Sequence, residues 1–272
     1  MRADLHIHSN YSDGIHSPAE IFSQAAEQGI GILSITDHDT VDHLQPCREE
    51  AAKTGITFIS GVEFSTSHEE RDVHILGYAL DDKDPVLLEY LEKVRLCRVE
   101  RAYRILELLG EQGVNIPREE IDQLPARSII SRPLIARLMV KYKFVRTIDE
   151  AFVRFLRTGS KAFVPYSLDS PARMVELINR CDGISVLAHP SLEEFETLAP
   201  ELCRAGLMGV EVFRPQIQES DRYEISYMAE QMGLVLTGGS DWHYNMKPRV
   251  FGDFTIDEVK IRPFLELVKQ RQ

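Results

Sequence analysis

The chain has 272 residues, is 43% hydrophobic and carries a formal net charge of −12 at pH 7. This length fits one large domain or two ordinary ones, and the apolar content is enough for a sizeable core. The acidic balance excludes broad, non-specific binding to nucleic acid, so we expect no stable DNA partner. No apolar run is long enough to span a membrane. Cys47, Cys97, Cys181 and Cys203 are scattered singly, which is typical of thiols in a reducing compartment, and we expect a cytoplasmic protein.

The N-terminal segment predicts a strand over residues 2–8, because Leu5 and Ile7 alternate with polar residues. The sequence Ser17-Pro18-Ala19-Glu20 predicts the start of a helix, with a capping residue followed by proline and glutamate. Six more strands are expected at 31–36, 57–64, 73–80, 183–188, 209–213 and 233–237. Helices are expected between most of them, at about 17–28, 41–53, 171–182, 195–205 and 219–232, with a last helix at 257–269. This alternation of helices and apolar strands indicates a parallel sheet covered by helices.

The alternation stops between residues 83 and 165. A long helix is expected from about residue 85 to 113, and shorter helices at 117–124, 131–143 and 147–157. Residues 92–161 contain fifteen Lys or Arg and nine Asp or Glu, a balance of +6 that leaves −18 for the rest. We therefore expect a helical, substrate-recognising insertion at 83–165 within a metal-dependent domain formed by 1–82 and 166–272.

Histidines and carboxylates gather at or near the C-terminal ends of the expected strands, with the exception of His74, which lies near the start of the strand at 73–80. The candidates are His6, His8, Asp13, His38, Glu63, His74, His189, Asp241 and His243. In a parallel α/β barrel the loops at the C-terminal strand ends converge on the active site. Each residue alone has a plain structural explanation, such as a helix cap or a tight turn. Nine nitrogen and oxygen ligands together exceed the needs of one ion and predict two or three divalent ions.

Five segments resemble the motifs of the PHP (polymerase and histidinol phosphatase) family. They are Asp4–His8 with Ser12–Gly14, Ser34–Asp39, Gly61–Glu63, Leu187–Pro190 and Gly238–His243. The resemblance runs over both halves of the chain and is specific in the order and spacing of its motifs. It implies an α/β fold, a distorted (β/α)7 TIM-like barrel with a helical insertion.

The resemblance also implies a ligand set for up to three metal ions. One ion would be held by His6, His8, Glu63 and Asp241. A second would share Glu63 with His74 and His189, and a third would use Asp13, His38 and His243. We expect manganese first. Iron and zinc are alternatives, because this mixed set of nitrogen and oxygen ligands does not discriminate sharply among these metals.

Within the family, the chain looks most like stand-alone phosphoesterases that act on nucleoside bisphosphates or on RNA from the 5′ end. Such proteins share the sequence Ser131-Arg132-Pro133 in a helical insertion, but often have histidine where this chain has Leu134. That departure bears on substrate specificity and not on the chemistry. A small phosphorylated nucleotide or short RNA is the expected substrate.

The hypothesis for the reaction is attack on phosphorus by a metal-bridging hydroxide. Asp13, His38, His189 and His243 are the expected catalytic residues, and the leaving oxygen would be protonated by a metal-bound water or a site histidine. Arg95, Arg98, Arg101 and Arg104 share a helix face; for any one of them a solvated face, with Glu100 and Glu107 as partners, explains the pattern equally well. We expect Arg98, Arg101, Ser131 and Arg132 to bind substrate phosphate, because the guanidinium fork suits a phosphate group.

Two other functions stay open. The protein could be a phosphatase for a small metabolite such as histidinol phosphate, although the basic insertion favours a substrate with two phosphates. It could also be a non-catalytic, metal-stabilised module of a larger assembly, against which the full set of nine ligand positions argues. The oligomeric state is not predicted.

Overall fold

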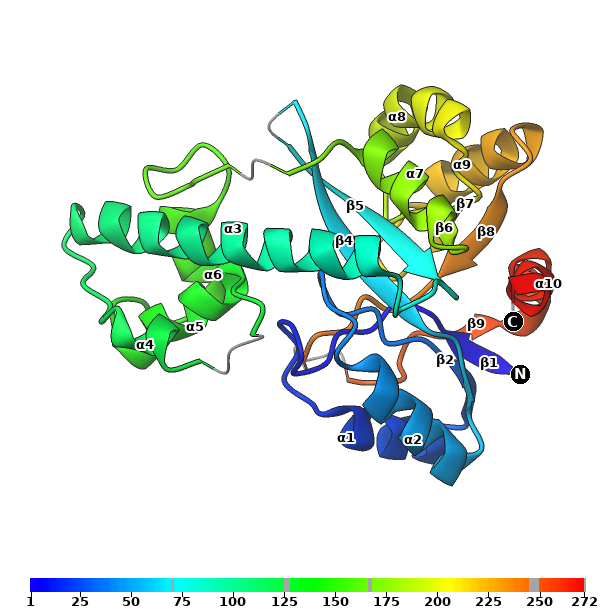
Figure 1. Ribbon diagram of the computed structural model, residues 1–272, viewed down its shortest axis with the longest axis horizontal. Coiled ribbons are helices and arrows are strands. Elements are labelled where there is room, and N and C mark those ends of the chain that lie inside the picture. The colour runs from blue at the N-terminus through cyan, green and yellow to red at the C-terminus, as the bar shows by residue number, and fades with distance from the viewer. Residues whose placement is uncertain (70, 125–127, 166–167, 245–249, 272) are drawn as a thin grey trace.

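A computed structural model describes residues 1–69, 71–124, 128–165, 168–244 and 250–271. Two β-sheets lie at the centre, helices cover their outer faces, and a helical segment projects to one side (Figure 1). The expected domain boundary at residue 166 lies outside the described residues. Within them, no helix combines the length and the apolarity that a membrane span requires.

The first sheet has the strand order β3-β2-β1-β9 and contains both strand directions. Strands β1, β2 and β3 are parallel, and β9 runs antiparallel to β1. Their bounds are β1 Arg2–Asp4, β2 Ile30–Leu33, β3 Thr57–Phe58 and β9 Ile256–Asp257. The chain stays extended after β1, where Leu5 and Ile7 are wholly buried in the core.

The second sheet has the order β4-β5-β6-β7-β8. Its strands are β4 Gly61–His68, β5 Arg71–Tyr78, β6 Ile184–Leu187, β7 Gly209–Phe213 and β8 Val235–Gly238. Strands β6, β7 and β8 are parallel, but β5 is antiparallel to both of its neighbours. The expectation of a purely parallel sheet is therefore wrong. No helix separates β4 from β5, and a short connection can join only antiparallel strands.

Hydrogen bonds outside the named strands join the two sheets. The backbone of residues 5–8 runs beside residues 238–242, with His8 N donating to Trp242 O at 2.8 Å and Asp241 N donating to His6 O at 2.9 Å. A second bridge pairs His38 with Glu63. The fold is thus α/β with two mixed sheets, and the described strands do not form one continuous closed barrel.

Helices surround these sheets on the outside (Figure 1). They are α1 Pro18–Glu27, α2 Leu44–Thr54, α7 Pro171–Arg180, α8 Leu192–Ala205, α9 Glu219–Gln231 and α10 Arg262–Arg271, with a 3-10 turn η2 at Glu258–Ile261. The predicted start of α1 is confirmed: Ser17 Oγ accepts from Glu20 N, and the Glu20 carboxylate accepts from Ser17 N.

The helical segment contains α3 Pro85–Gly110, α4 Glu119–Asp122, α5 Arg132–Lys141, α6 Ile148–Ala151 and the π-helical turn η1 Phe152–Leu156. The 26-residue helix α3 belongs to two hydrophobic cores. Leu87 and Leu91 pack in the core of the second sheet, whereas Ile105 and Leu109 pack against α5 and its neighbours. The helix therefore connects the insertion to the sheets as one continuous element (Figure 1).

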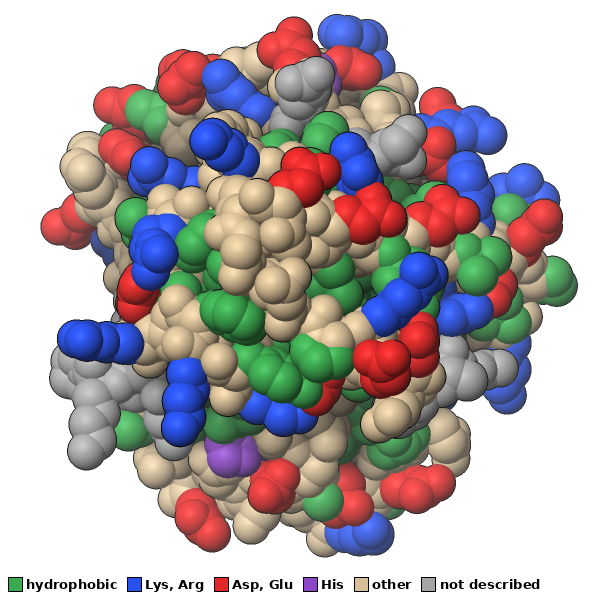
Figure 2. Space-filling view, turned by 90° about the vertical axis from the view of Figure 1, so that its left-hand side faces the viewer, with side chains coloured by type: hydrophobic (Ala, Val, Ile, Leu, Met, Phe, Trp, Pro, Cys, Tyr) green, Lys and Arg blue, Asp and Glu red, His purple; other side chains and the backbone are tan. Residues whose placement is uncertain are grey.

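The surface at the insertion end carries charges of both signs. Figure 2 shows Lys and Arg side chains interspersed with Asp and Glu over this face. Several basic residues have acidic partners, as in Arg104–Glu107 at 2.8 Å and Lys141–Glu120 at 2.7 Å. The positive balance of the insertion is thus not presented there as one continuous basic patch.

Candidate metal centre

The extended chain after β1 carries the first two candidate ligands. Because side chains alternate along an extended chain, Leu5 and Ile7 enter the core while His6 and His8 share the opposite face. Both imidazoles are fully buried, and their Nε2 atoms are 3.2 Å apart. Two imidazole nitrogens at this distance can bind one ion from the same side.

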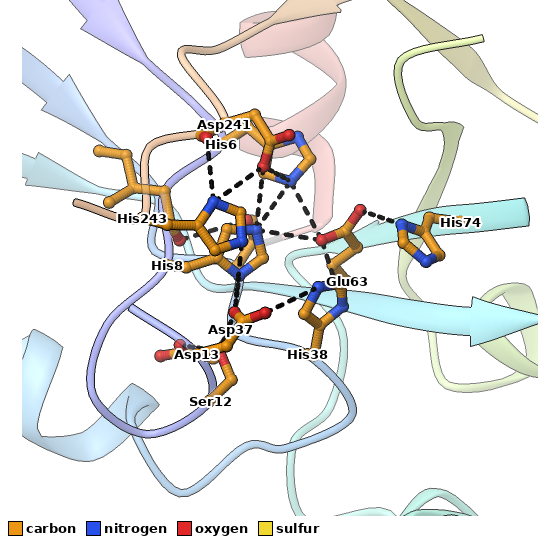
Figure 3. Close-up of polar contacts among 12 residues, drawn as sticks. His6, His8, Ser12, Asp13, Asp37, His38, Glu63, His74, Asp241 and His243 are labelled. Atoms are coloured by element: carbon orange, nitrogen blue, oxygen red, sulfur yellow. Dashed lines mark hydrogen bonds and ion pairs between the residues drawn. The ribbon is translucent and has the colours of Figure 1, made fainter. Parts of the chain in front are cut away.

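Glu63 on β4 and Asp241 after β8 complete a four-residue group around these nitrogens. His8 Nε2 lies 3.1 Å from Glu63 Oε2 and 3.2 Å from Asp241 Oδ1, and the matching distances from His6 Nε2 are 3.2 and 3.5 Å. Two ligands of a tetrahedral ion at about 2.1 Å from the metal are roughly 3.4 Å apart. The four donor atoms have the spacing of one coordination shell (Figure 3).

A second group is formed by Asp13, His38, His243 and the other nitrogen of His8. Asp13 Oδ1 lies 3.3 Å from His243 Nε2 and 3.7 Å from His8 Nδ1, and Asp13 Oδ2 lies 4.0 Å from His38 Nε2. The family resemblance implies Asp13, His38 and His243 as one ligand set. The structure brings these three together and adds His8, whose two nitrogens face two different groups.

Glu63 lies between the ligand groups, and each of its oxygens faces different partners. Oε2 is within 3.3 Å of a nitrogen of His6, His8 and His38. Oε1 lies 2.8 Å from His74 Nδ1 and 3.0 Å from His189 Nε2. His74 can reach Glu63 because β4 and β5 are antiparallel neighbours. A carboxylate placed in this way could be shared between two ions.

Several of these nitrogens have no hydrogen bond although carboxylate oxygens are near. The Nδ1 atoms of His8, His38 and His74 are buried and without a hydrogen-bond partner. Burying such atoms unpaired is costly, and native proteins rarely do so without a ligand. A cation between these imidazole nitrogens and the nearby carboxylate oxygens would satisfy the lone pairs of both. The residues present therefore fit divalent metal ions.

The charge states of the cluster agree with this assignment. Burial opposes ionisation of Glu63, but the adjacent His38, His74 and His6 outweigh it and hold the Glu63 pKa well below its usual range. Burial also opposes charging of His8, yet hydrogen bonds to Asp241 and Glu63 raise its pKa to about 10. Burial lowers the pKa of His38 to about 4, so the charge is not shared equally among the histidines. Without metal, His8 is thus an imidazolium, and metal binding must displace its proton.

Glu211 on β7 holds His6 in place and was missed by the sequence analysis. Both of its carboxylate oxygens lie 3.1 Å from His6 Nδ1, which turns Nε2 toward the metal group. Glu211 Oε2 also accepts a hydrogen bond of 3.0 Å from His189 N. A carboxylate behind a ligating histidine fixes the ring and raises its basicity. The only signal in the sequence is an acidic residue within the apolar strand Gly209–Phe213.

Asp37 orders the loop that carries Asp13. It accepts hydrogen bonds from Ser9 N at 2.8 Å and from the Ser9 hydroxyl at 2.5 Å. The Ser12 hydroxyl also donates to Asp37, at 2.5 Å (Figure 3). His43 is fully buried beside Asp37, and its Nδ1 lies 3.6 Å from Asp37 Oδ2. Gly14 closes the loop, since a Cβ at this position would lie 2.2 Å from His8 O.

The residues expected to bind phosphate line one cavity with the metal centre. Arg98, Arg101, Ser131 and Arg132 border a cavity of about 280 Å³ together with His38, His74 and His189. Ser131 Oγ caps α5 by accepting from Leu134 N. The structure therefore brings all four residues to the edge of the site, and their phosphate contacts stay a prediction.

The arginines of this cavity already have partners within the protein. The buried Arg98 donates from Nε and Nη2 to Asp39 and from Nη2 to Ser65 Oγ. Arg101 Nε donates to Val164 O at 2.7 Å, and Arg132 Nη2 donates to Asp72 Oδ2 at 2.6 Å. Arg98 and Arg132 thereby attach the insertion to Asp39 and Asp72 outside it, whereas the contact of Arg101 with Val164 lies within residues 83–165.

Two further cavities meet at the metal centre. One, of about 720 Å³, is lined by the aromatic residues Phe152, Trp242, Tyr244 and Phe254. The other, of about 220 Å³, follows β7 and β8. Asp241 borders all three cavities, so ligands in any of them would lie beside the same carboxylate.

Comparisons with known proteins agree with this geometry. Residues 4–117 match the family model described as PHP domain. The chain is 32% identical over 248 residues to the 3′,5′-nucleoside bisphosphate phosphatase of Chromobacterium violaceum, covering 88% of this chain and 86% of that protein. It is 30% identical over 247 residues to the 5′-3′ exoribonuclease Rnm of Escherichia coli, covering 88% and 84%.

A solved structure from Bifidobacterium adolescentis, of a protein inferred to be a metal-dependent phosphoesterase, superimposes with a TM-score of 0.87. It is 26% identical and covers 97% of this chain and 96% of that one. Since the relatives match over most of their own length and the ligand groups are complete in the structure, the chain belongs to the PHP family and is a metal-dependent phosphoesterase.

Proposed function

We propose that the protein hydrolyses phosphate monoesters of nucleotides, either nucleoside 3′,5′-bisphosphates or short RNA with a 5′-phosphate. Two or three divalent ions, with manganese as the first candidate, would occupy the ligand groups. The observation that carries the proposal is the position of Glu63, whose two oxygens face separate sets of histidines. The names of the two relatives, a nucleoside bisphosphate phosphatase and an exoribonuclease, support the nucleotide class of substrate.

The residues of the site have distinct parts in this proposal. Divalent ions bound there would acidify a water molecule and offset the negative charge of the phosphoryl group. Glu63 holds the ligand groups at a fixed separation, and Glu211 keeps His6 Nε2 directed into the site. Asp13, His38 and His243 form the group on the other side of His8, where they would hold a further ion.

The cavities beside the centre have room for a nucleotide. A base and sugar fit into the cavity of about 720 Å³, whose aromatic side chains offer stacking surfaces. The phosphate to be hydrolysed would enter the cavity of about 280 Å³ that holds His38, His74 and His189. A small metabolite would leave the larger cavity unfilled, which favours the nucleotide.

The two sheets, joined by the bridges of Ile7 with Trp242 and of His38 with Glu63, would correspond to a distorted, incompletely closed barrel. Residues 83–165 would act as the substrate-recognition domain of a cytoplasmic enzyme whose remaining residues, 1–82 and 166–272, hold the metals.

Side-by-side assays test the proposal. Turnover of adenosine 3′,5′-bisphosphate, AMP, histidinol phosphate and 5′-phosphorylated oligoribonucleotides should be measured with manganese, with magnesium and after chelation. We expect the bisphosphate or the oligoribonucleotides to be preferred. Chelation should abolish turnover, and manganese should restore it better than magnesium, because imidazole is a poor ligand for the harder magnesium ion. Preference for histidinol phosphate, or full activity with magnesium alone, would contradict the proposal.

A further inference from the structure

The loops after β7 and β8 form a polar cavity beside the metal centre. This cavity, of about 220 Å³, is lined by Arg214, Gln216 and Ser240. His189, Glu211 and Asp241 of the metal centre border it as well. Because β7 and β8 are adjacent parallel strands, Arg214 and Asp241 follow strand ends at the same edge of the sheet.

Arg214 differs from Arg98 and Arg132 in its hydrogen bonding. Its Nη2 donates to Pro190 O at 2.9 Å, which fixes the direction of the guanidinium group. Its Nε is buried and has no hydrogen-bond partner, and none of the ion pairs among the described residues includes Arg214. A buried charged donor without an acceptor is costly, so an external acceptor is expected. Arg98 and Arg132, by contrast, already hold Asp39 and Asp72.

We propose that Arg214 binds a second phosphate group of the substrate, the one that is not hydrolysed. This inference rests on the proposed phosphoesterase function. A guanidinium fork can donate two parallel hydrogen bonds to phosphate oxygens, and here the contact with Pro190 O holds it in place beforehand. Arg214 also lines the cavity of about 720 Å³, so a nucleoside bound there could carry its second phosphate to this residue.

The carboxylates in the same cavity do not account for Arg214. Glu211 accepts hydrogen bonds from His6 Nδ1 and His189 N, and Asp241 belongs to the first metal group. Neither forms an ion pair with Arg214 in the described part of the chain. A different explanation is that Arg214 only positions Pro190 and through it His189. The test therefore needs a measurement that a positioning role alone would not change selectively.

The test compares ligands that differ by one phosphate group. Binding of non-hydrolysable phosphonate analogues of adenosine 3′,5′-bisphosphate, 3′-AMP and 5′-AMP to the metal-loaded protein is measured by calorimetry. We expect Arg214→Ala to weaken binding of the bisphosphate analogue by about ten- to hundredfold and of at least one monophosphate analogue by less than about threefold. Arg214→Lys should recover part of the loss. Arg173→Ala, which removes an exposed arginine paired with Glu176, should change neither.

The outcomes separate this inference from the proposed function. Equal losses on all three analogues would assign Arg214 to positioning of the metal centre, and unchanged binding would leave it without a substrate contact; either result overturns the inference. The proposed function fails separately, if wild-type protein hydrolyses none of the esters with manganese while the Arg214-dependent preference for the bisphosphate analogue persists. Metal content, measured for each variant, should stay that of the wild type.

Discussion

The metal centre and the insertion hold their charged side chains in opposite ways. In the metal centre, the Nδ1 atoms of His8, His38 and His74 lie near carboxylates without forming hydrogen bonds. In the insertion, Arg98 and Arg132 are engaged in hydrogen-bonded ion pairs with carboxylates of the sheets. One region therefore keeps its donor atoms available for ions, whereas the other uses its charges to attach two parts of the chain.

Glu63→Gln tests the metal side of this comparison and should have the largest effect. The neutral amide cannot bridge two cations as the carboxylate can, so we expect turnover to fall by at least about 10³-fold and bound metal to decrease. Turnover and metal content are measured at saturating manganese, with the exposed Glu193→Gln as the control. A Glu63→Gln protein with full metal content and wild-type turnover would remove the bridging role.

Arg98→Met tests the attachment of the insertion. It leaves the buried Asp39 carboxylate without its ion-pair partner, with only the hydrogen bond from Ser65 N retained among the described residues. We expect the free energy of unfolding, measured by urea denaturation, to fall by roughly 3–5 kcal/mol. The double variant Arg98→Met/Asp39→Asn should recover much of the loss, because the buried charge is removed too. Arg104, in an exposed pair on the same helix, gives the matched control: Arg104→Met should change stability by less than about 0.5 kcal/mol. Equal effects of the two single substitutions would mean that burial of the Arg98 pair has no consequence.

Glu211→Gln tests whether Glu211 only orients the metal ligand His6 or itself binds metal. The variant weakens the support of His6 but leaves the ligand groups intact, so metal affinity should fall by about ten- to hundredfold. Excess manganese should then restore turnover, which it should not do for Glu63→Gln. Titration of activity with manganese measures the difference, and failure of excess metal to rescue Glu211→Gln would place this residue among the essential ligands.

Arg132→Ala should have the smallest effect of the four. Its guanidinium group is already paired with Asp72, so only a minor share of phosphate binding is left to it. We expect catalytic efficiency to fall by less than about tenfold with adenosine 3′,5′-bisphosphate. A hundredfold loss confined to that substrate would mean that the insertion, through Arg132, binds the second phosphate.

Local rules account for the parts of the site that the sequence could predict. His6 and His8 share a face because an extended chain alternates its side chains, and that needs no knowledge of the rest of the fold. The start of α1 and the long helix α3 follow in the same way from capping residues and helical spacing. The predicted grouping of Glu63 with His74 came from the family resemblance, since the antiparallel pairing of β4 and β5 was not foreseen.

The remaining residues depend on contacts between distant segments. Helical spacing put Arg98 on a face with other arginines, but it could not reveal that Asp39, 59 positions away, lies opposite. Asp37 follows a strand just as His38 does, yet it holds the Ser9–Asp13 loop, whereas His38 faces the ligand groups. Which carboxylate holds a loop and which faces the ions is decided by tertiary packing.

The helix α3 also constrains how the protein unfolds and moves. Because its first half is packed in the sheet core and its second half in the core of the insertion, neither core can lose α3 without exposing apolar side chains of the other. Hydrogen exchange along α3 should therefore proceed in a single cooperative step rather than in two halves. For the same reason we expect the insertion to keep a fixed position beside the cavity that it lines together with the metal centre.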